Sequence, residues 1–172
     1  MCYFLTIASP LTLSEVRSML PTGLSAQPVG PAEAGDLRRL LRSAQTVATL
    51  LSGACSCDLV HPRDPNPRED ERLLRTRYFQ LKLSRDEIIR ELERHRRRAA
   101  SAGTSDVGPR DLVAFAAEHA RNAGPTLYSL RFGPASPAPP LGAAETVTRT
   151  VADLRSNPDR WLPEGSVVRL VR

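Results

Sequence analysis

Apolar residues recur along this chain in short runs and in strict alternation, and both patterns predict β-strands. Residues 2–8 read Cys-Tyr-Phe-Leu-Thr-Ile-Ala, whose length and β-forming side chains are typical of a buried strand. In residues 126–132, aromatic and leucine side chains share one face of an alternating segment. Residues 46–52 fit either a strand or the continuation of a helix, and their β-branched side chains favour a strand. The remaining expected strands are 24–29, 146–151 and 166–171.

Capping residues and helical spacing predict the elements between these strands. Thr12 and Glu15 have the spacing of a capping box that begins one helix, and Pro21 ends it. Pro31 to Gly35 is a helix-breaking cluster, so the next helical pattern is expected to begin at Asp36. Further helices are expected at 67–81, 84–99 and 109–123, with one helical turn at 153–157. In the helix at 67–81, the expected apolar stripe holds Leu74, Tyr78 and Leu81.

The order of these elements indicates the α+β class. We expect a single mixed or largely antiparallel sheet with helices packed on one face. It has an N-terminal β-α-β unit, a central helical insertion and C-terminal strands. The 172 residues suit one domain over residues 1–172. Its expected loops lie at 61–67, 100–108 and 134–144.

The N-terminal unit has a consequence for the cysteines. If the third strand is inserted between the first two, it runs antiparallel to the first, and its end lies beside the start of the first. Cys2 begins the first strand, while Cys55 and Cys57 follow the third. The topology therefore predicts that all three thiols of the chain converge.

Composition narrows the class of protein. No apolar run reaches the roughly 18 residues that span a bilayer, and the N-terminus lacks the pattern of a signal peptide. Three cysteines are too few for the disulfide framework of a small secreted protein. We therefore expect a cytoplasmic protein with no membrane partner. The net charge is +5, and residues 61–100 supply most of it, with 12 basic and 8 acidic side chains.

The segment Cys55-Ser56-Cys57-Asp58-Leu59-Val60-His61 holds the densest chemistry of the chain. Thiolates and imidazole are the ligands of zinc and of other thiophilic metals. The leading hypothesis is a thiol-centred site that binds a transition metal or acts in redox chemistry. Two alternatives stay open: thiols that only pack, and thiol catalysis with Cys55 or Cys57 as the nucleophile, His61 as the base and Asp58 orienting it. The candidate metal ligands are Cys2, Cys55, Cys57, Asp58 and His61.

The arginine-rich helix at 84–99 carries the alternative function. Arg94, Arg97 and Arg98 gather near its C-terminal end, where cations also complement the helix dipole. The alternative is a non-enzymatic interaction module that binds nucleic acid or an acidic protein through these side chains. Several arginines of this helix have an acidic side chain one turn before them, as in the pairs Asp86–Arg90 and Glu93–Arg97. This spacing is equally typical of a solvent-exposed helix face stabilised by ion pairs.

Other candidate residues are better explained by packing. His95 and His119 lie on or near apolar stripes, which is typical of histidines at the edge of a core. Trp161 lies between two prolines and is expected to fill the core. The chain contains no G-x-S-x-G, H-E-x-x-H, Walker A or G-x-G-x-x-G sequence, so no catalytic residue and no enzymatic activity are assigned.

Overall fold

The structure is a computed structural model of the whole chain. It describes residues 2–53, 56–60, 67–101, 107–133, 144–158 and 160–172. For residues 2, 58, 67–70 and 98–101 it describes the backbone only.

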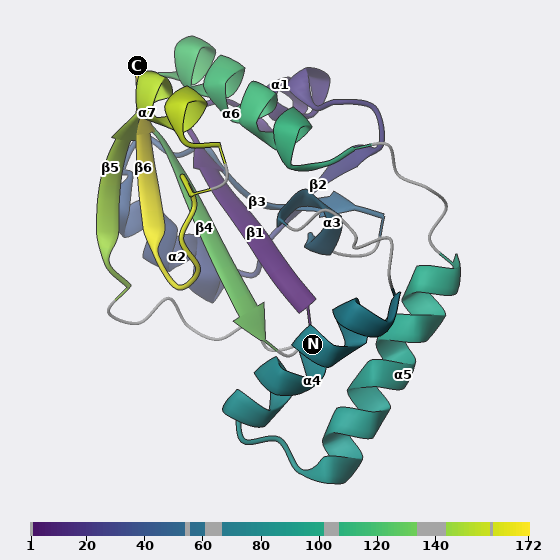
Figure 1. The fold of residues 1–172 in the computed structure, drawn as a ribbon. Coiled ribbons are helices and arrows are strands. Elements are labelled where there is room, and N and C mark those ends of the chain that lie inside the picture. Colours follow the sequence, from purple (N-terminus) through teal and green to yellow (C-terminus); the bar gives the residue numbers. More distant parts are fainter. Residues whose placement is uncertain (1, 54–55, 61–66, 102–106, 134–143, 159) are drawn as a thin grey trace.

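One six-stranded sheet forms the centre of the molecule, in the order β2-β3-β1-β4-β6-β5 (Figure 1). Neighbouring strands are antiparallel, except for β5 and β6, which are parallel. The sheet is therefore mixed, and the predicted α+β class is confirmed. Its strands are β1 (Cys2–Ser9), β2 (Leu24–Pro28), β3 (Thr46–Ser52), β4 (Thr126–Gly133), β5 (Thr146–Thr150) and β6 (Val167–Val171).

The N-terminal unit has the predicted topology, with β3 inserted between β1 and β2. Helix α1 (Leu13–Met19) connects β1 to β2, and the capping box of Thr12 and Glu15 begins it as expected. Leu5 of β1 faces Leu50 of β3 in an antiparallel register. The end of β3 consequently lies beside the start of β1.

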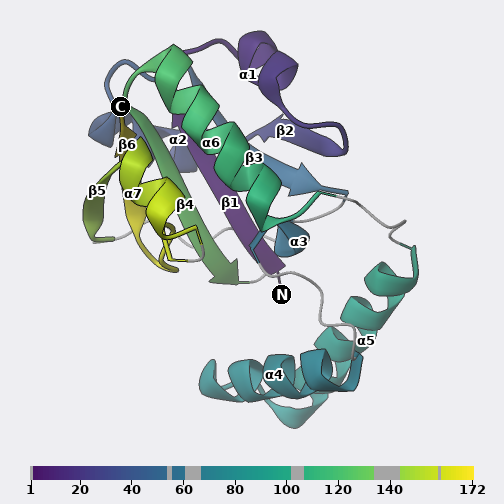
Figure 2. The same ribbon diagram turned by 45° about the horizontal axis from the view of Figure 1, so that its top comes forward.

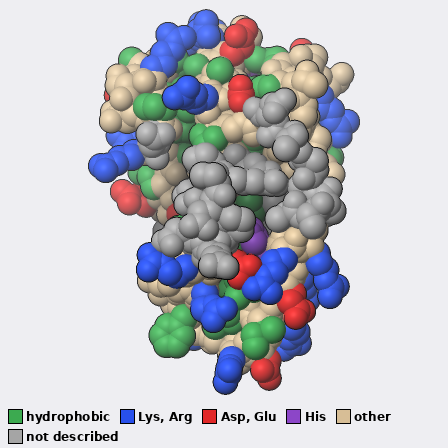
Figure 3. All heavy atoms as spheres, turned by 45° about the vertical axis from the view of Figure 1, so that its right-hand side comes forward, with side chains coloured by type: hydrophobic (Ala, Val, Ile, Leu, Met, Phe, Trp, Pro, Cys, Tyr) green, Lys and Arg blue, Asp and Glu red, His purple; other side chains and the backbone are tan. Residues whose placement is uncertain are grey.

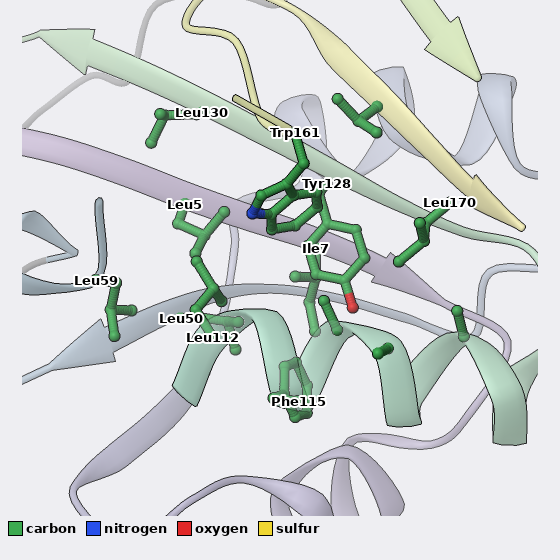
Figure 4. Close-up of a cluster of buried hydrophobic side chains, with 14 of the residues drawn as sticks. Leu5, Ile7, Leu50, Leu59, Leu112, Phe115, Tyr128, Leu130, Trp161 and Leu170 are labelled. Carbon is green, nitrogen blue, oxygen red and sulfur yellow. The ribbon is translucent and has the colours of Figure 1, made fainter. Parts of the chain in front are cut away.

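The larger hydrophobic core lies between the sheet and the helices α3 (Cys57–Val60), α6 (Pro109–Ala123) and α7 (Val151–Ser156). Alternation along β1 points Leu5 and Ile7 to this side, where both are fully buried. Leu112 and Phe115 of α6 are buried in the same cluster (Figure 4). Each such buried side chain contributes roughly 1.5–3 kcal/mol from removal of apolar surface from water.

Helix α2 (Pro31–Leu40) packs on the opposite face of the sheet, so helices cover both faces and the expectation of helices on one face is wrong. Its Leu37 packs against Ala8, Val47 and Leu127. These strand residues point to the face of the sheet opposite to the one that Leu5 faces. The expected start at Asp36 is wrong, because the helix begins five residues earlier. Pro31 occupies the first turn of the helix, where a backbone N–H has no partner within the helix, so the N–H that proline lacks is not missed. The residues expected to break a helix therefore begin one.

Helices α4 (Pro67–Gln80) and α5 (Arg85–Ser101) form a hairpin that projects beyond the sheet (Figure 2). The Glu71 carboxylate accepts two hydrogen bonds from the Arg96 guanidinium and joins the two helices. The hairpin contacts the sheet through Tyr78, whose ring stacks on Phe132 at 6.1 Å between centroids. The prediction for Leu81 is wrong: α4 ends at Gln80, and Leu81 lies in the turn, 45% exposed.

No helix in the described part of the chain combines the length and the apolarity needed to cross a membrane.

Candidate thiol site and the cavity beside it

Ser56, the residue between the two neighbouring cysteines, ties their segment to the start of β1. Its hydroxyl accepts a hydrogen bond from the Leu5 backbone N–H at 3.0 Å and donates one to the Leu50 carbonyl at 2.6 Å. Its own backbone N–H donates to the Tyr3 carbonyl at 3.4 Å. Ser56 is fully buried, and each of these bonds satisfies a group that would otherwise lose its hydrogen bond to water.

Local conformation explains why the chain turns back at this point. Gly53 follows β3 with φ of 67°, a left-handed conformation that glycine adopts without steric cost. The single-turn helix α3 begins at Cys57, where the sequence predicted no helix. Leu59 of this turn is fully buried in the larger core and holds the turn against the sheet. The segment therefore lies across the first residues of β1.

The five predicted metal ligands divide between described and undescribed parts of the chain. The Cys57 side chain is partly buried and packs against the larger core. Cys2 and Asp58 are described as backbone only, in β1 and α3, and Cys55 and His61 lie outside the described residues. Among the side chains that are described, no group of three or more His, Cys, Asp or Glu has the geometry of a metal site. That finding covers only Cys57 of the predicted set.

A cavity of about 800 Å³ opens beside this segment. Its walls come from the start of β1, from α3, from the first turn of α6 and from the segment that precedes β6. Leu59, Leu112, Leu130 and Trp161 form much of its lining, and all four are buried members of the larger core (Figure 4). Trp161 thus fills the core as predicted, and it also borders a cavity.

Tyr3, Arg77 and Glu164 form a polar cluster at the edge of the cavity. The Arg77 guanidinium lies 5.0 Å from the centre of the Tyr3 ring and 4.2 Å from that of Phe132, and it forms an ion pair with Glu164. The Tyr3 hydroxyl donates a long hydrogen bond of 3.5 Å to Glu164 Oε2. Burial raises the pKa of Tyr3, Arg77 lowers it by a smaller amount, and Cys57 raises it. The Ser56 N–H also donates to the Tyr3 carbonyl, so this cluster and the thiol segment adjoin.

A second polar cluster lies deep in the core and involves His119. Its Nε2 is 2.7 Å from the Ser9 hydroxyl, and its Nδ1 is 2.7 Å from the Tyr128 hydroxyl. All three residues are buried, so this arrangement of hydroxyl and imidazole is closed to substrate. Burial lowers the pKa of His119 to about 4. The sequence predicted a histidine at the edge of the core, whereas His119 is fully buried and both of its ring nitrogens have partners.

The arginines predicted to bind nucleic acid or an acidic protein differ in their surroundings. Arg94 is exposed and forms an ion pair with Glu91 one turn before it. Arg97 is exposed, and the Arg98 side chain lies outside the described part of α5. Acidic side chains are interspersed among the basic ones over the hairpin surface (Figure 3).

Sequence reasoning missed the residues that organise the site. In the sequence, Ser56 is only the spacer between two cysteines, and Glu164 stands between a proline and a glycine, a pattern typical of a turn. Arg77 was one of many arginines. Their roles depend on contacts across 51, 161 and 87 positions of the chain, which no local pattern reveals.

Comparison of the chain with known protein families, with curated proteins and with solved structures finds no match.

Proposed function

We propose that the protein binds a thiophilic transition metal, such as zinc, through Cys2, Cys55 and Cys57. The observation that carries the proposal is the hydrogen bond from the Ser56 N–H to the Tyr3 carbonyl at 3.4 Å. Ser56 is the chain neighbour of both Cys55 and Cys57, and Tyr3 is the chain neighbour of Cys2. This bond holds a neighbour of Cys2 against the residue between Cys55 and Cys57, which supports a site built from the three thiols.

Two further features support a metal at this place. The buried Ser56 hydroxyl fixes the segment from both sides, as a site that holds ligands in place requires. Three thiolates leave one position of a tetrahedral zinc ion for His61 or Asp58, or for a water molecule.

The test is metal analysis of protein purified without oxygen, combined with cobalt titration. We expect about one equivalent of metal per chain, and a thiolate-to-cobalt absorption band whose intensity falls with each cysteine removed. Cys2→Ser, Cys55→Ser and Cys57→Ser are each expected to reduce the metal content. Ser18→Ala is the control, because its exposed hydroxyl bonds only within α1.

Thiol counting separates metal binding from redox chemistry and from packing. Metal removal by a chelator is expected to release three titratable thiols. If the protein holds no metal and mild oxidation lowers the count of titratable thiols by two, the site is a redox-active disulfide pair and not a metal site. Less than about a tenth of an equivalent of metal, with cobalt giving no thiolate band, would refute the proposal.

A second function is favoured by the apolar side chains on the hairpin. Leu73, Phe79 and Ile89 are 58%, 76% and 46% exposed among many arginines. We propose that the hairpin docks an acidic, amphipathic protein segment through such side chains. Exposed apolar side chains, Phe79 above all, suit a protein partner better than a phosphate backbone.

The probes for this second function are a peptide of glutamate and leucine with helical amphipathic spacing, and a single-stranded oligonucleotide of mixed sequence. We expect the peptide to bind more tightly than the oligonucleotide, and Phe79→Ser to weaken it. Gln80→Ser, at the exposed neighbouring position, is the control and leaves binding unchanged. Tighter, strongly salt-dependent binding of the oligonucleotide would instead identify a nucleic-acid surface.

A further inference from the structure

The cavity beside α3 has the size and the lining of a site for a small molecule. Its volume of about 800 Å³ lies within the range of roughly 300–1,000 Å³ that is usual for such sites. We propose that it binds a small organic acid with an apolar body and one anionic group. Its described lining contains no cysteine, so the proposal does not depend on a bound metal.

The apolar part of the cavity is already formed. Val60 and Leu162 line it and are partly exposed, so they offer apolar surface to a ligand, and the buried Leu59 and Leu130, which also border it, are fixed by the core. The Trp161 ring meets the Tyr128 ring edge to face at 5.1 Å between centroids, which fixes its orientation (Figure 4). A ligand that binds here therefore immobilises few side chains. Little of the free energy gained by burying its apolar surface is then lost to the ordering of the protein.

The charges around the cavity indicate the sign of the ligand. Glu164 is neutralised by its ion pair with Arg77. The Asp111 carboxylate accepts the Gly108 backbone N–H at 2.9 Å and caps its own helix. Arg110 also lines the cavity and is exposed, and no carboxylate of the described residues pairs with it. Among the described charged residues of the lining, Arg110 is therefore the one left to pair with a ligand.

The position of Arg110 sets where the acidic group of the ligand lies. Because Asp111 already occupies the N–H at the start of α6, we assign the anionic group to the Arg110 guanidinium rather than to the helix end. Arg110 is exposed at the rim of the cavity, so its guanidinium and the anionic group of the ligand both keep contact with water. Only the apolar body of the ligand is buried, and no charge has to be removed from water.

Two naphthalene probes test this proposal on the full, metal-free chain. Anilinonaphthalene sulfonate carries an anionic group, and N-phenylnaphthylamine has a similar body without charge. Trp161 is the single tryptophan of the chain, so energy transfer from it to a bound probe reports binding at this cavity. We expect one bound probe per chain, with strong transfer and tighter binding of the anionic probe.

Two variants and their matched controls locate the site. Arg110→Gln is expected to weaken the anionic probe about tenfold, the loss of one charge-assisted hydrogen bond, and to leave the neutral probe unchanged. Arg121→Gln, at the other end of the same helix, changes neither. Val60→Phe fills the cavity and weakens both probes, whereas Val113→Phe, also partly buried against the same core but outside the cavity, weakens neither.

Circular dichroism of each variant separates a filled cavity from a lost fold. Equal affinity of the two probes for the wild-type chain would overturn the assignment of an acidic ligand. Binding without energy transfer from Trp161, or binding that survives Val60→Phe in a folded protein, would overturn the site itself.

Discussion

The His119 imidazole and the Ser9 hydroxyl lie 2.7 Å apart, although 110 positions separate them in the chain. Ser9 ends the central strand β1, and His119 lies in the third turn of α6. The Tyr128 hydroxyl, also 2.7 Å away, occupies the second ring nitrogen. A neutral imidazole has one donor and one acceptor nitrogen, and a hydroxyl serves either. The two hydroxyls can satisfy the ring in either charge state, so it is burial that keeps His119 uncharged, by lowering the pKa of its imidazole to about 4.

Stability is expected to fall as the pH decreases from about 6.5 to about 4. Burial lowers the pKa of His119 from 6.5 to about 4, so in this range the unfolded chain binds a proton that the folded chain does not. This difference contributes about 3 kcal/mol, present above pH 6.5 and lost progressively below it. Urea unfolding at several pH values measures it. His119→Gln removes this contribution, and parallel curves for the two proteins would contradict the assignment.

Ser56→Ala is expected to destabilise the fold by about 2 kcal/mol. The change removes two buried hydrogen bonds and leaves the Leu5 N–H without its partner. It also releases the segment that carries Cys57, so the reaction of this thiol with a disulfide reagent becomes faster. Ser18→Ala serves as the control and changes stability by less than about 0.5 kcal/mol. An unchanged thiol rate would mean that Ser56 does not position the segment.

Glu33→Gln is expected to cost about 3 kcal/mol because it removes the counterion of a buried arginine. Glu33 in α2 forms an ion pair with Arg131 in β4, and the two side chains are 17% and 8% exposed. Glu33 Oε1 also accepts a hydrogen bond from the Thr6 hydroxyl at 2.9 Å. Urea denaturation measures the loss.

The double variant Glu33→Leu with Arg131→Met is expected to lose less than the sum of the single changes, because no charge stays buried. Asp36→Asn, in an exposed pair of the same helix, is expected to cost less than about 0.5 kcal/mol and serves as the control. Additive losses in the double variant would contradict a coupled pair.

Arg77→Gln is expected to loosen the hairpin without unfolding the sheet. Arg77 joins α4 to the sheet through Glu164 and through the faces of the Tyr3 and Phe132 rings. Losing these contacts is expected to speed amide hydrogen exchange about tenfold in α4 and α5, with little change in β1 and β4. Arg75→Gln, at an exposed position of the same helix, is the control. Equal acceleration throughout the molecule would show that Arg77 stabilises the whole fold instead.

The strands and most helix boundaries followed from local chemistry, and so were predictable. The capping box of Thr12 and Glu15 is set by residues three positions apart, and the structure contains it. The start of α2 was not predicted, because Pro31 reads as a breaker unless it occupies the first turn of a helix. Leu81 fitted the helical spacing but follows the last residue of α4, so it faces solvent.

The candidate site was predictable in outline and not in detail. The inserted strand β3 follows from the order of the elements, and it brings the segment after β3 to the start of β1. The contacts of Ser56 and Arg77 could not be predicted from the sequence, because their partners lie in other elements, far away along the chain. The cavity likewise depends on walls from segments as distant as Leu59 and Trp161.

The central position of β1 constrains how the protein is made in the cell. This strand leaves the ribosome before both of its partners, β3 and β4, and β4 begins only at Thr126. Until β4 is synthesised, a strand rich in apolar side chains keeps an unpaired edge, which is prone to aggregate. Expression yield should therefore respond to translation speed and to chaperones more than the stability of the finished fold suggests.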